Sequence, residues 1–147
     1  DIRDCFDRIR HACVKRRLSS LLTDQRVVRL IMDAVAAPKK QGRRLLGRSR
    51  GLPQGSPLSP ILSNIVLDMY DQAMARKGYV HVRYSDDLVL LGRNQAEIRE
   101  ILQFSRRFLK GLGLTLSTEK TYESTWKRGF SFLGVFFQKA RKTTGNA

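Results

Sequence analysis

The sequence is poor in the residues that form covalent or metal cross-links. It has two cysteines and two histidines in 147 residues. Cys5 and Cys13 stand in one early segment without the spacing of a metal site or a disulfide framework, so we expect reduced, packed thiols. His11 and His81 are isolated, and we expect ordinary surface or strand residues. No apolar run has the length of a membrane span, and we expect neither a span nor a signal peptide.

Acidic residues are also scarce relative to basic ones. Thirteen Asp and Glu residues stand against 28 Lys and Arg residues, a formal net charge of +15. This excess favours a polyanionic partner, with nucleic acid ahead of an anionic membrane, although a very soluble basic surface explains the charge equally well. The length and the 41% apolar content suit one domain with a core, and the free thiols suit the cytosol.

The hydrophobic pattern predicts an α+β fold in which an antiparallel sheet is backed by helices. We expect helices at residues 7–22, 23–35, 60–77 and 94–113, and strands at 79–84, 88–92, 114–117 and 130–137. Residues 38–50 read as a basic loop or hairpin, and residues 138–147 as a basic tail. Because residue 1 already lies inside a patterned segment, we expect an excerpt from a longer chain.

Two adjacent aspartates, Asp86 and Asp87, stand between two expected strands. Adjacent carboxylates repel each other unless a cation lies between them, and Mg²⁺ takes hard oxygen ligands, often only one or two from protein. Asp1, at the end of another expected strand, is the best candidate for a third carboxylate, with which two metal ions could support phosphoryl transfer. Taken alone, the pair fits a plain turn better, since Asp is a common turn residue.

Five motifs that occur in order favour a metal site over a plain turn for Asp86 and Asp87. They are DIRDCF (1–6), GLPQGSPLSP (51–60), YSDD (84–87), GLTLSTEKT (113–121) and FLG (132–134). Together they resemble successive motifs of reverse transcriptases, most closely the bacterial group II intron type, with GLPQGSPLSP similar to CRISPR-associated branches. The resemblance covers nearly the whole chain. It implies a polymerase palm with part of the fingers over residues 1–147, and it implies that further fingers and a helical thumb lie outside this chain, which we do not expect to work alone.

The resemblance also implies roles for single residues. Asp1 and Asp86 match the principal metal-binding aspartates, and Asp87 matches their companion. The carbonyl of Ile2 would complete the shell of two Mg²⁺ ions, with Mn²⁺ as the alternative. Phe6 falls where the family has a steric gate against the 2′-hydroxyl, which implies a choice of deoxynucleotides. Without the resemblance, a core aromatic is an equally good reading of Phe6.

Other implied contacts involve the nucleotide and the primer. Gln54, Gly55 and Tyr84 match nucleotide-binding positions, and Lys120 matches a lysine near the triphosphate that can protonate the leaving pyrophosphate. The alternative for Gln54 and Gly55 is a proline-rich turn that enters a helix, and the alternative for Lys120 is an ordinary solvated lysine. The primer grip corresponds to Phe132, Leu133 and Gly134, and the candidates for nucleic-acid backbone contacts are Arg43, Arg44, Arg48 and Arg50, for which a solvated basic loop is the simpler reading.

The activity that the resemblance implies is RNA-directed DNA synthesis, a nucleotidyltransferase reaction, by a bacterial cytoplasmic enzyme. Its partners would be an RNA template, a DNA or RNA primer and dNTPs, with intron RNA or Cas proteins as further candidates and no membrane. Two rivals stay open: an RNA-directed RNA polymerase palm and a maturase-like RNA-binding module that keeps the polymerase fold. Intron mobility, spacer acquisition and phage defence all remain possible settings.

Overall fold

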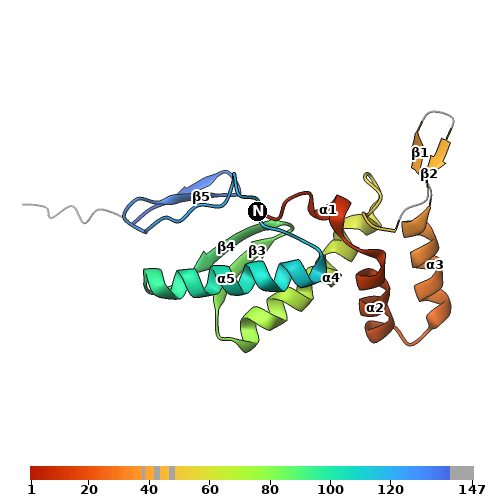
Figure 1. Ribbon diagram of the computed structural model, residues 1–147, viewed down its shortest axis with the longest axis horizontal. Helices are drawn as coiled ribbons and strands as arrows, with labels where there is room; N and C mark the ends of the chain where they lie inside the picture. The colour runs from red at the N-terminus through yellow and green to blue at the C-terminus, as the bar shows by residue number, and fades with distance from the viewer. Residues whose placement is uncertain (38, 42–43, 47–48, 140–147) are drawn as a thin grey trace, which may run out of the picture. The chain divides into compact units, whose positions relative to one another are not determined.

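The computed structural model describes residues 1–37, 39–41, 44–46 and 49–139 (Figure 1). The chain forms two compact units, Asp1–Ser117 and Thr118–Ala147. The helices are α1 (Cys5–Arg8), α2 (His11–Leu21), α3 (Gln25–Ala36), α4 (Leu58–Arg76) and α5 (Gln95–Leu112). The strands are β1 (Lys39–Gln41), β2 (Arg44–Leu46), β3 (Val80–Tyr84), β4 (Asp87–Leu91), β5 (Phe130–Phe132) and β6 (Val135–Phe137).

The predicted α+β class is confirmed. Consecutive strands pair as antiparallel hairpins, β1 with β2, β3 with β4 and β5 with β6. The described strands form three separate two-stranded ladders and not one continuous sheet. None of the helices in the described part of the chain is long and apolar enough to cross a bilayer.

The single helix predicted over residues 7–22 is wrong, because the chain straightens between α1 and α2. Ile9 and Arg10 have ψ angles of 122° and 131°, which are extended values. The Ile9 carbonyl accepts a hydrogen bond from the Gly51 amide at 2.8 Å, and Arg10 forms an antiparallel bridge with Arg50. Pairing with the segment before α4 therefore replaces the helical hydrogen bonds that a local pattern would suggest.

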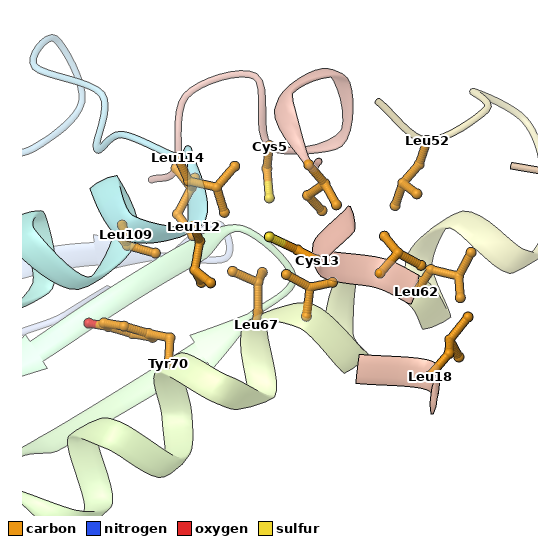
Figure 2. Packing of buried hydrophobic residues seen from close by; sticks show 14 of the residues in the cluster. Cys5, Cys13, Leu18, Leu52, Leu62, Leu67, Tyr70, Leu109, Leu112 and Leu114 are labelled. Atoms are coloured by element: carbon orange, nitrogen blue, oxygen red, sulfur yellow. The ribbon is translucent and has the colours of Figure 1, made fainter. Parts of the chain in front are cut away.

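The core of the first unit lies between α4, α5 and the N-terminal helices. Figure 2 shows Leu67 of α4 directed toward Leu112 of α5, with the sulfur atoms of Cys5 and Cys13 in the same cluster. The Tyr70 hydroxyl is buried and lies 2.8 Å from the hydroxyl of Ser105 on α5, so this polar group has a partner. The two long helices thus form a rigid support beneath the β3–β4 hairpin, whose strands they contact (Figure 1).

The hairpin β3–β4 agrees with the predicted strands and has one exposed face. Tyr84 pairs with Asp87 across the strands, and Val82 pairs with Val89. Tyr84 and Val82 are 64% and 48% exposed, whereas the alternate β3 residues point toward α4. The hairpin therefore presents one face outward with Asp87 at its end.

In the second unit, the single strand predicted over residues 130–137 is wrong, since the chain reverses in its middle. Phe132 pairs with Val135, and the two residues between them have positive φ, 50° at Leu133 and 77° at Gly134. Positive φ at both central residues is the signature of a type I′ hairpin turn, which favours glycine at the second position. Phe130 and Phe137 stack at 5.5 Å between ring centres across the two strands.

Candidate active site

The first residues of the chain lie beside the tip of the β3–β4 hairpin. The Ile2 amide donates to the Asp86 carbonyl at 2.9 Å. On the other edge, the Arg3 amide donates to Thr115 at 2.8 Å, and the Asp1 carbonyl accepts from Ser117 at 2.9 Å. Residues 1–3 therefore run as a short strand between the hairpin tip and residues 115–117. The strand expected at 114–117 is reduced to a single antiparallel bridge between Leu116 and Ile2. This bridge fixes the register of residues 1–3 against residues 115–117.

The hairpin tip is a two-residue turn formed by Ser85 and Asp86. Its φ is positive only at the first position, 56° at Ser85, as in type II′ turns, where glycine is the usual residue. A serine in this region is strained, and such strain persists only where surrounding contacts impose it. Asp86 follows directly, and Asp87 begins β4 on the exposed face opposite Tyr84. Asp86 therefore lies in the turn itself, whereas Asp87 is the first residue of β4.

The donors around this tip suit a hard cation. The N–H and C=O of one strand residue point to the same edge, so the Ile2 carbonyl faces the hairpin as its amide does. Among the residues that the structure describes, no group of three or more His, Cys, Asp or Glu side chains is arranged to hold a metal. Mg²⁺ needs only one or two carboxylates when phosphates and water complete its shell, so carboxylates with a backbone carbonyl fit that ion.

The GLPQG segment is tied to the first motif by backbone hydrogen bonds. The Leu52 amide donates to the Phe6 carbonyl at 2.7 Å. His11, which we expected to be an ordinary residue, is buried, and its Nε2 lies 2.8 Å from the Gly51 carbonyl oxygen. Gly51 has a φ of 84°, and a Cβ there would lie 2.9 Å from the Asp7 carbonyl oxygen. Only glycine therefore allows the two motifs to approach this closely.

The nucleotide-binding candidates lie on these joined segments. Phe6 is half-buried on α1 and packs against the core. Gln54 is exposed, and its side-chain amide lies 3.4 Å and 3.5 Å from the two carboxylate oxygens of Asp7. Gly55 has a φ of 80° with open space beside it. The Leu52–Phe6 hydrogen bond thus connects the motif that contains Phe6 to the motif that contains Gln54 and Gly55.

Comparison with known families identifies the family to which these motifs belong. The family described as reverse transcriptase (RNA-dependent DNA polymerase) matches residues 1–137. The chain belongs to the reverse transcriptase family. The resemblance inferred from the motifs is confirmed.

Among its relatives, the Retron Mx65 reverse transcriptase of Myxococcus xanthus is 28% identical over 132 residues, 82% of this chain and 31% of that protein. A 91 kDa protein in the cob intron of Schizosaccharomyces pombe is 43% identical over 72 residues, 49% of this chain and 9% of that protein. Protein YkfC of Escherichia coli is 31% identical over 84 residues, 57% of this chain and 20% of that protein. The chain therefore spans less than a third of the length of these relatives.

The remaining candidates of this reverse transcriptase domain lie elsewhere in the chain. Lys120 is exposed in the second unit, and so are Leu133 and Gly134 in the turn between β5 and β6. Arg50 is exposed, and Arg44 lies on β2. Arg43, Arg48 and residues 140–147 of the basic tail lie outside the described residues.

Sequence reasoning missed the polar cluster beneath the hairpin. Asp71 on α4 accepts hydrogen bonds from the Arg83 guanidinium and lies 3.0 Å from Nε2 of His81. Burial raises the pKa of the Asp71 carboxyl, but the hydrogen bonds from Arg83 and His81 outweigh it and leave the pKa below its usual value. Strand alternation could have grouped His81 with Arg83, but nothing in the sequence indicated their partner on α4.

Cys5 is a buried free cysteine with a thiol of low reactivity. Burial raises the pKa of its thiol to about 11, against a smaller lowering by Ser63, whose hydroxyl lies 3.9 Å from the sulfur. The thiol is therefore protonated at neutral pH and is a poor nucleophile. This agrees with the expected packed, reduced state of both cysteines, which have no disulfide.

Proposed function

We propose that this chain is the catalytic palm of an RNA-directed DNA polymerase that extends a primer 3′-hydroxyl with deoxynucleoside triphosphates. The hydrogen bond from Ile2 to Asp86 supports this most directly, because it joins the first motif to the YSDD tip. Membership of the reverse transcriptase family supports the same reaction class. The chemistry needs charge neutralisation and alignment, for which carboxylates suffice and a protein nucleophile is unnecessary.

Divalent metal ions belong to this proposal, as is general for reverse transcriptases. Asp1, Asp86 and Asp87 with the Ile2 carbonyl would hold two Mg²⁺ ions, or Mn²⁺ in their place. When bound, such ions neutralise phosphate charge and stabilise the attacking and leaving oxygens of an in-line displacement. The protein supplies hard oxygen donors on a turn that backbone hydrogen bonds hold in one geometry.

The other residues act on the nucleotide and the primer. Phe6 would form a wall against a 2′-hydroxyl, and Gln54, Gly55 and Tyr84 would contact the incoming nucleotide. Lys120 would protonate the leaving pyrophosphate. Phe132, Leu133 and Gly134 would hold the primer end against the site. The RNA template would follow basic surface, consistent with the formal net charge of +15.

A second candidate is a maturase-like RNA-binding role. The match to a cob-intron protein favours it, because it makes intron RNA a candidate ligand. The charge excess serves RNA binding whether or not synthesis occurs. The two roles differ in their dependence on the aspartates, which RNA binding does not need.

Primer extension by the full-length protein tests the proposal. Wild-type protein should extend a primer on an RNA template with dNTPs and Mg²⁺, and Asp86→Ala should lower the rate at least about 100-fold, because a lost charge-stabilising group typically costs 10²–10³. RNA affinity should stay the same. Asp33→Ala, which removes an exposed aspartate of α3, is the matched control and should extend normally.

Substantial extension by Asp86→Ala would contradict the proposed role of the turn. If wild-type protein binds RNA equally well with and without Mg²⁺ and extends no primer, the RNA-binding role is the correct one. Efficient use of ribonucleotides by the wild-type protein would instead identify an RNA-directed RNA polymerase.

A further inference from the structure

We propose that Arg83 is a positioning residue that orients the catalytic turn, by holding the peptide plane before Asp86 against helix α4. The inference rests on the proposed function, because it concerns the presentation of the Asp86 carboxylate. Arg83 lies in β3, one residue before Tyr84, and belongs to none of the roles assigned above.

The guanidinium of Arg83 contacts three groups at once. Its Nε and Nη2 form a two-pronged contact with the Asp71 carboxylate, with Nε 2.9 Å from Oδ1. Its Nη1 donates to the Asn64 side-chain oxygen at 2.8 Å and to the Ser85 carbonyl at 2.9 Å. One planar group therefore connects two residues of α4 to the backbone of the turn.

The two peptide planes that flank Asp86 are both held in this way. The carbonyl before it, of Ser85, accepts from Arg83, and its own carbonyl accepts from the Ile2 amide at 2.9 Å. Rotation of either plane would turn the Asp86 Cα–Cβ bond away from its present direction. Because Ser85 has a strained φ of 56°, the turn needs such outside contacts to keep its shape.

The anchor for Arg83 is itself well fixed. Asn64 and Asp71 lie seven residues apart on α4, which puts them on the same face two turns apart. The side chains of Arg83 and Asp71 are 11% and 28% exposed, so solvent screens their contact only in part. His81 also contacts Asp71, and the buried residues of α4 hold the helix in the core. Motion of the turn relative to α4 is therefore restricted.

Lysine cannot replace this arrangement although it keeps the charge. Its single ammonium is a point donor, whereas the Arg83 contacts need several N–H groups spread across a rigid plane. Residues that orient a functional carboxylate without touching the substrate or metal typically change activity 10–100-fold when they are removed.

The chain contains a matched pair for comparison. Arg17 on α2 forms an ion pair with Asp68 on α4, one helical turn from Asp71. The Arg17 side chain is 20% exposed and that of Arg83 is 11% exposed. The hydrogen bond of Arg17 goes to Asp68 on α4, whereas Arg83 bonds both to α4 and to the Ser85 carbonyl of the turn. Arg17→Lys thus measures the general effect of weakening an arginine–aspartate contact to α4.

The experiment compares Arg83→Lys, Asn64→Ala and Arg17→Lys in the full-length protein by thermal unfolding, steady-state primer extension and amide hydrogen exchange. Arg83→Lys should lower kcat about 10–100-fold with little change in the KM for dNTP. It should also speed exchange of the Ile2 amide and of residues 85–87. Asn64→Ala should change both quantities in the same direction but less, and Arg17→Lys should change stability alone.

Equal kcat losses for Arg83→Lys and Arg17→Lys, or unchanged exchange at the turn in Arg83→Lys, would overturn the inference. If wild-type protein extends no primer, the proposed polymerase function fails, and exchange at Ile2 and residues 85–87 still decides whether Arg83 holds the turn. The two failures are therefore distinguishable.

Discussion

Backbone conformation at single residues shapes both loops of the site. Ser85 accepts a positive φ of 56° at the hairpin tip, and Gly51 has a φ of 84° where GLPQG meets the first motif. The two positions differ in what enforces them. Ser85 has a side chain and depends on hydrogen bonds from its surroundings, whereas Gly51 is needed because a neighbouring backbone fills the space where a Cβ would lie.

Gly51→Ala should therefore destabilise the protein. It would combine an unfavourable φ with a Cβ only 2.9 Å from the Asp7 carbonyl oxygen, and we expect a loss of about 1–3 kcal/mol in the free energy of unfolding, measured with urea. Gly78→Ala is the control, since Gly78 has a φ of 70° but nothing within 4 Å of its Cβ position. Equal losses for the two variants would show that the close approach is unimportant.

Phe6→Ala should relax the choice of sugar. The half-buried ring lies on α1, whose backbone is joined to GLPQG, so its removal opens space beside the proposed nucleotide site. We expect the ratio of kcat/KM for dNTP over rNTP to fall at least about tenfold, equivalent to about 1.4 kcal/mol of discrimination. Phe108→Ala, which removes another half-buried ring from the core, should lower stability without changing that ratio. An unchanged ratio in Phe6→Ala would refute the gate.

At the scale of elements, local signals predicted α3, α5 and the β3–β4 hairpin well. Asp24 caps α3, where its side chain accepts from the Arg26 amide at 2.8 Å, and Asn94 caps α5, where its side chain accepts from the Glu97 amide at 2.9 Å. Gly113 ends α5 with a φ of 82°. The helix expected over 7–22 failed because Ile9 and Arg10 pair with a distant segment, which no neighbouring residue signals.

Asn94→Ala should lower the stability of the first unit by about 1 kcal/mol, because the Glu97 amide would lose its partner. Urea unfolding with a probe in the first unit measures this change. Asn94→Gly should lower the free energy of unfolding by only about a few tenths of a kcal/mol, since glycine is also tolerated at the N-cap of helices. A loss in Asn94→Gly as large as in Asn94→Ala would contradict the capping role.

At the scale of the whole molecule, the cluster beneath the hairpin makes stability depend on pH. The pKa of Asp71 is lowered in the folded state, so the folded protein binds a proton less readily there than the unfolded chain does. The resulting stabilisation is fully present above the unfolded pKa of about 3.9 and is lost as the pH falls through the lower folded value. It links β3 to α4 and thereby the turn to the core.

Asp71→Asn should therefore destabilise the protein at pH 7, and this destabilisation should shrink progressively as the pH falls below about 4, toward the lowered folded pKa of Asp71. Urea unfolding of wild-type and variant protein across pH 3–7 checks this difference. Arg83→Gln should weaken the same pH dependence, because Arg83 supplies the hydrogen bonds that lower the Asp71 pKa. A difference between wild type and Asp71→Asn that stays constant with pH would mean that the carboxylate charge does not contribute.

The sequence by itself determined the α+β class, the helices α3 and α5, the hairpin at YSDD and membership of the reverse transcriptase family. These depend on hydrophobic periodicity and ordered motifs, which involve residues close together along the chain. Only the tertiary structure decided that Ile2 bonds to Asp86, that Gly51 lies against Asp7 and that Arg83 links the turn to α4. Such contacts join residues far apart in the chain, and which of them form depends on how the helices and strands pack together.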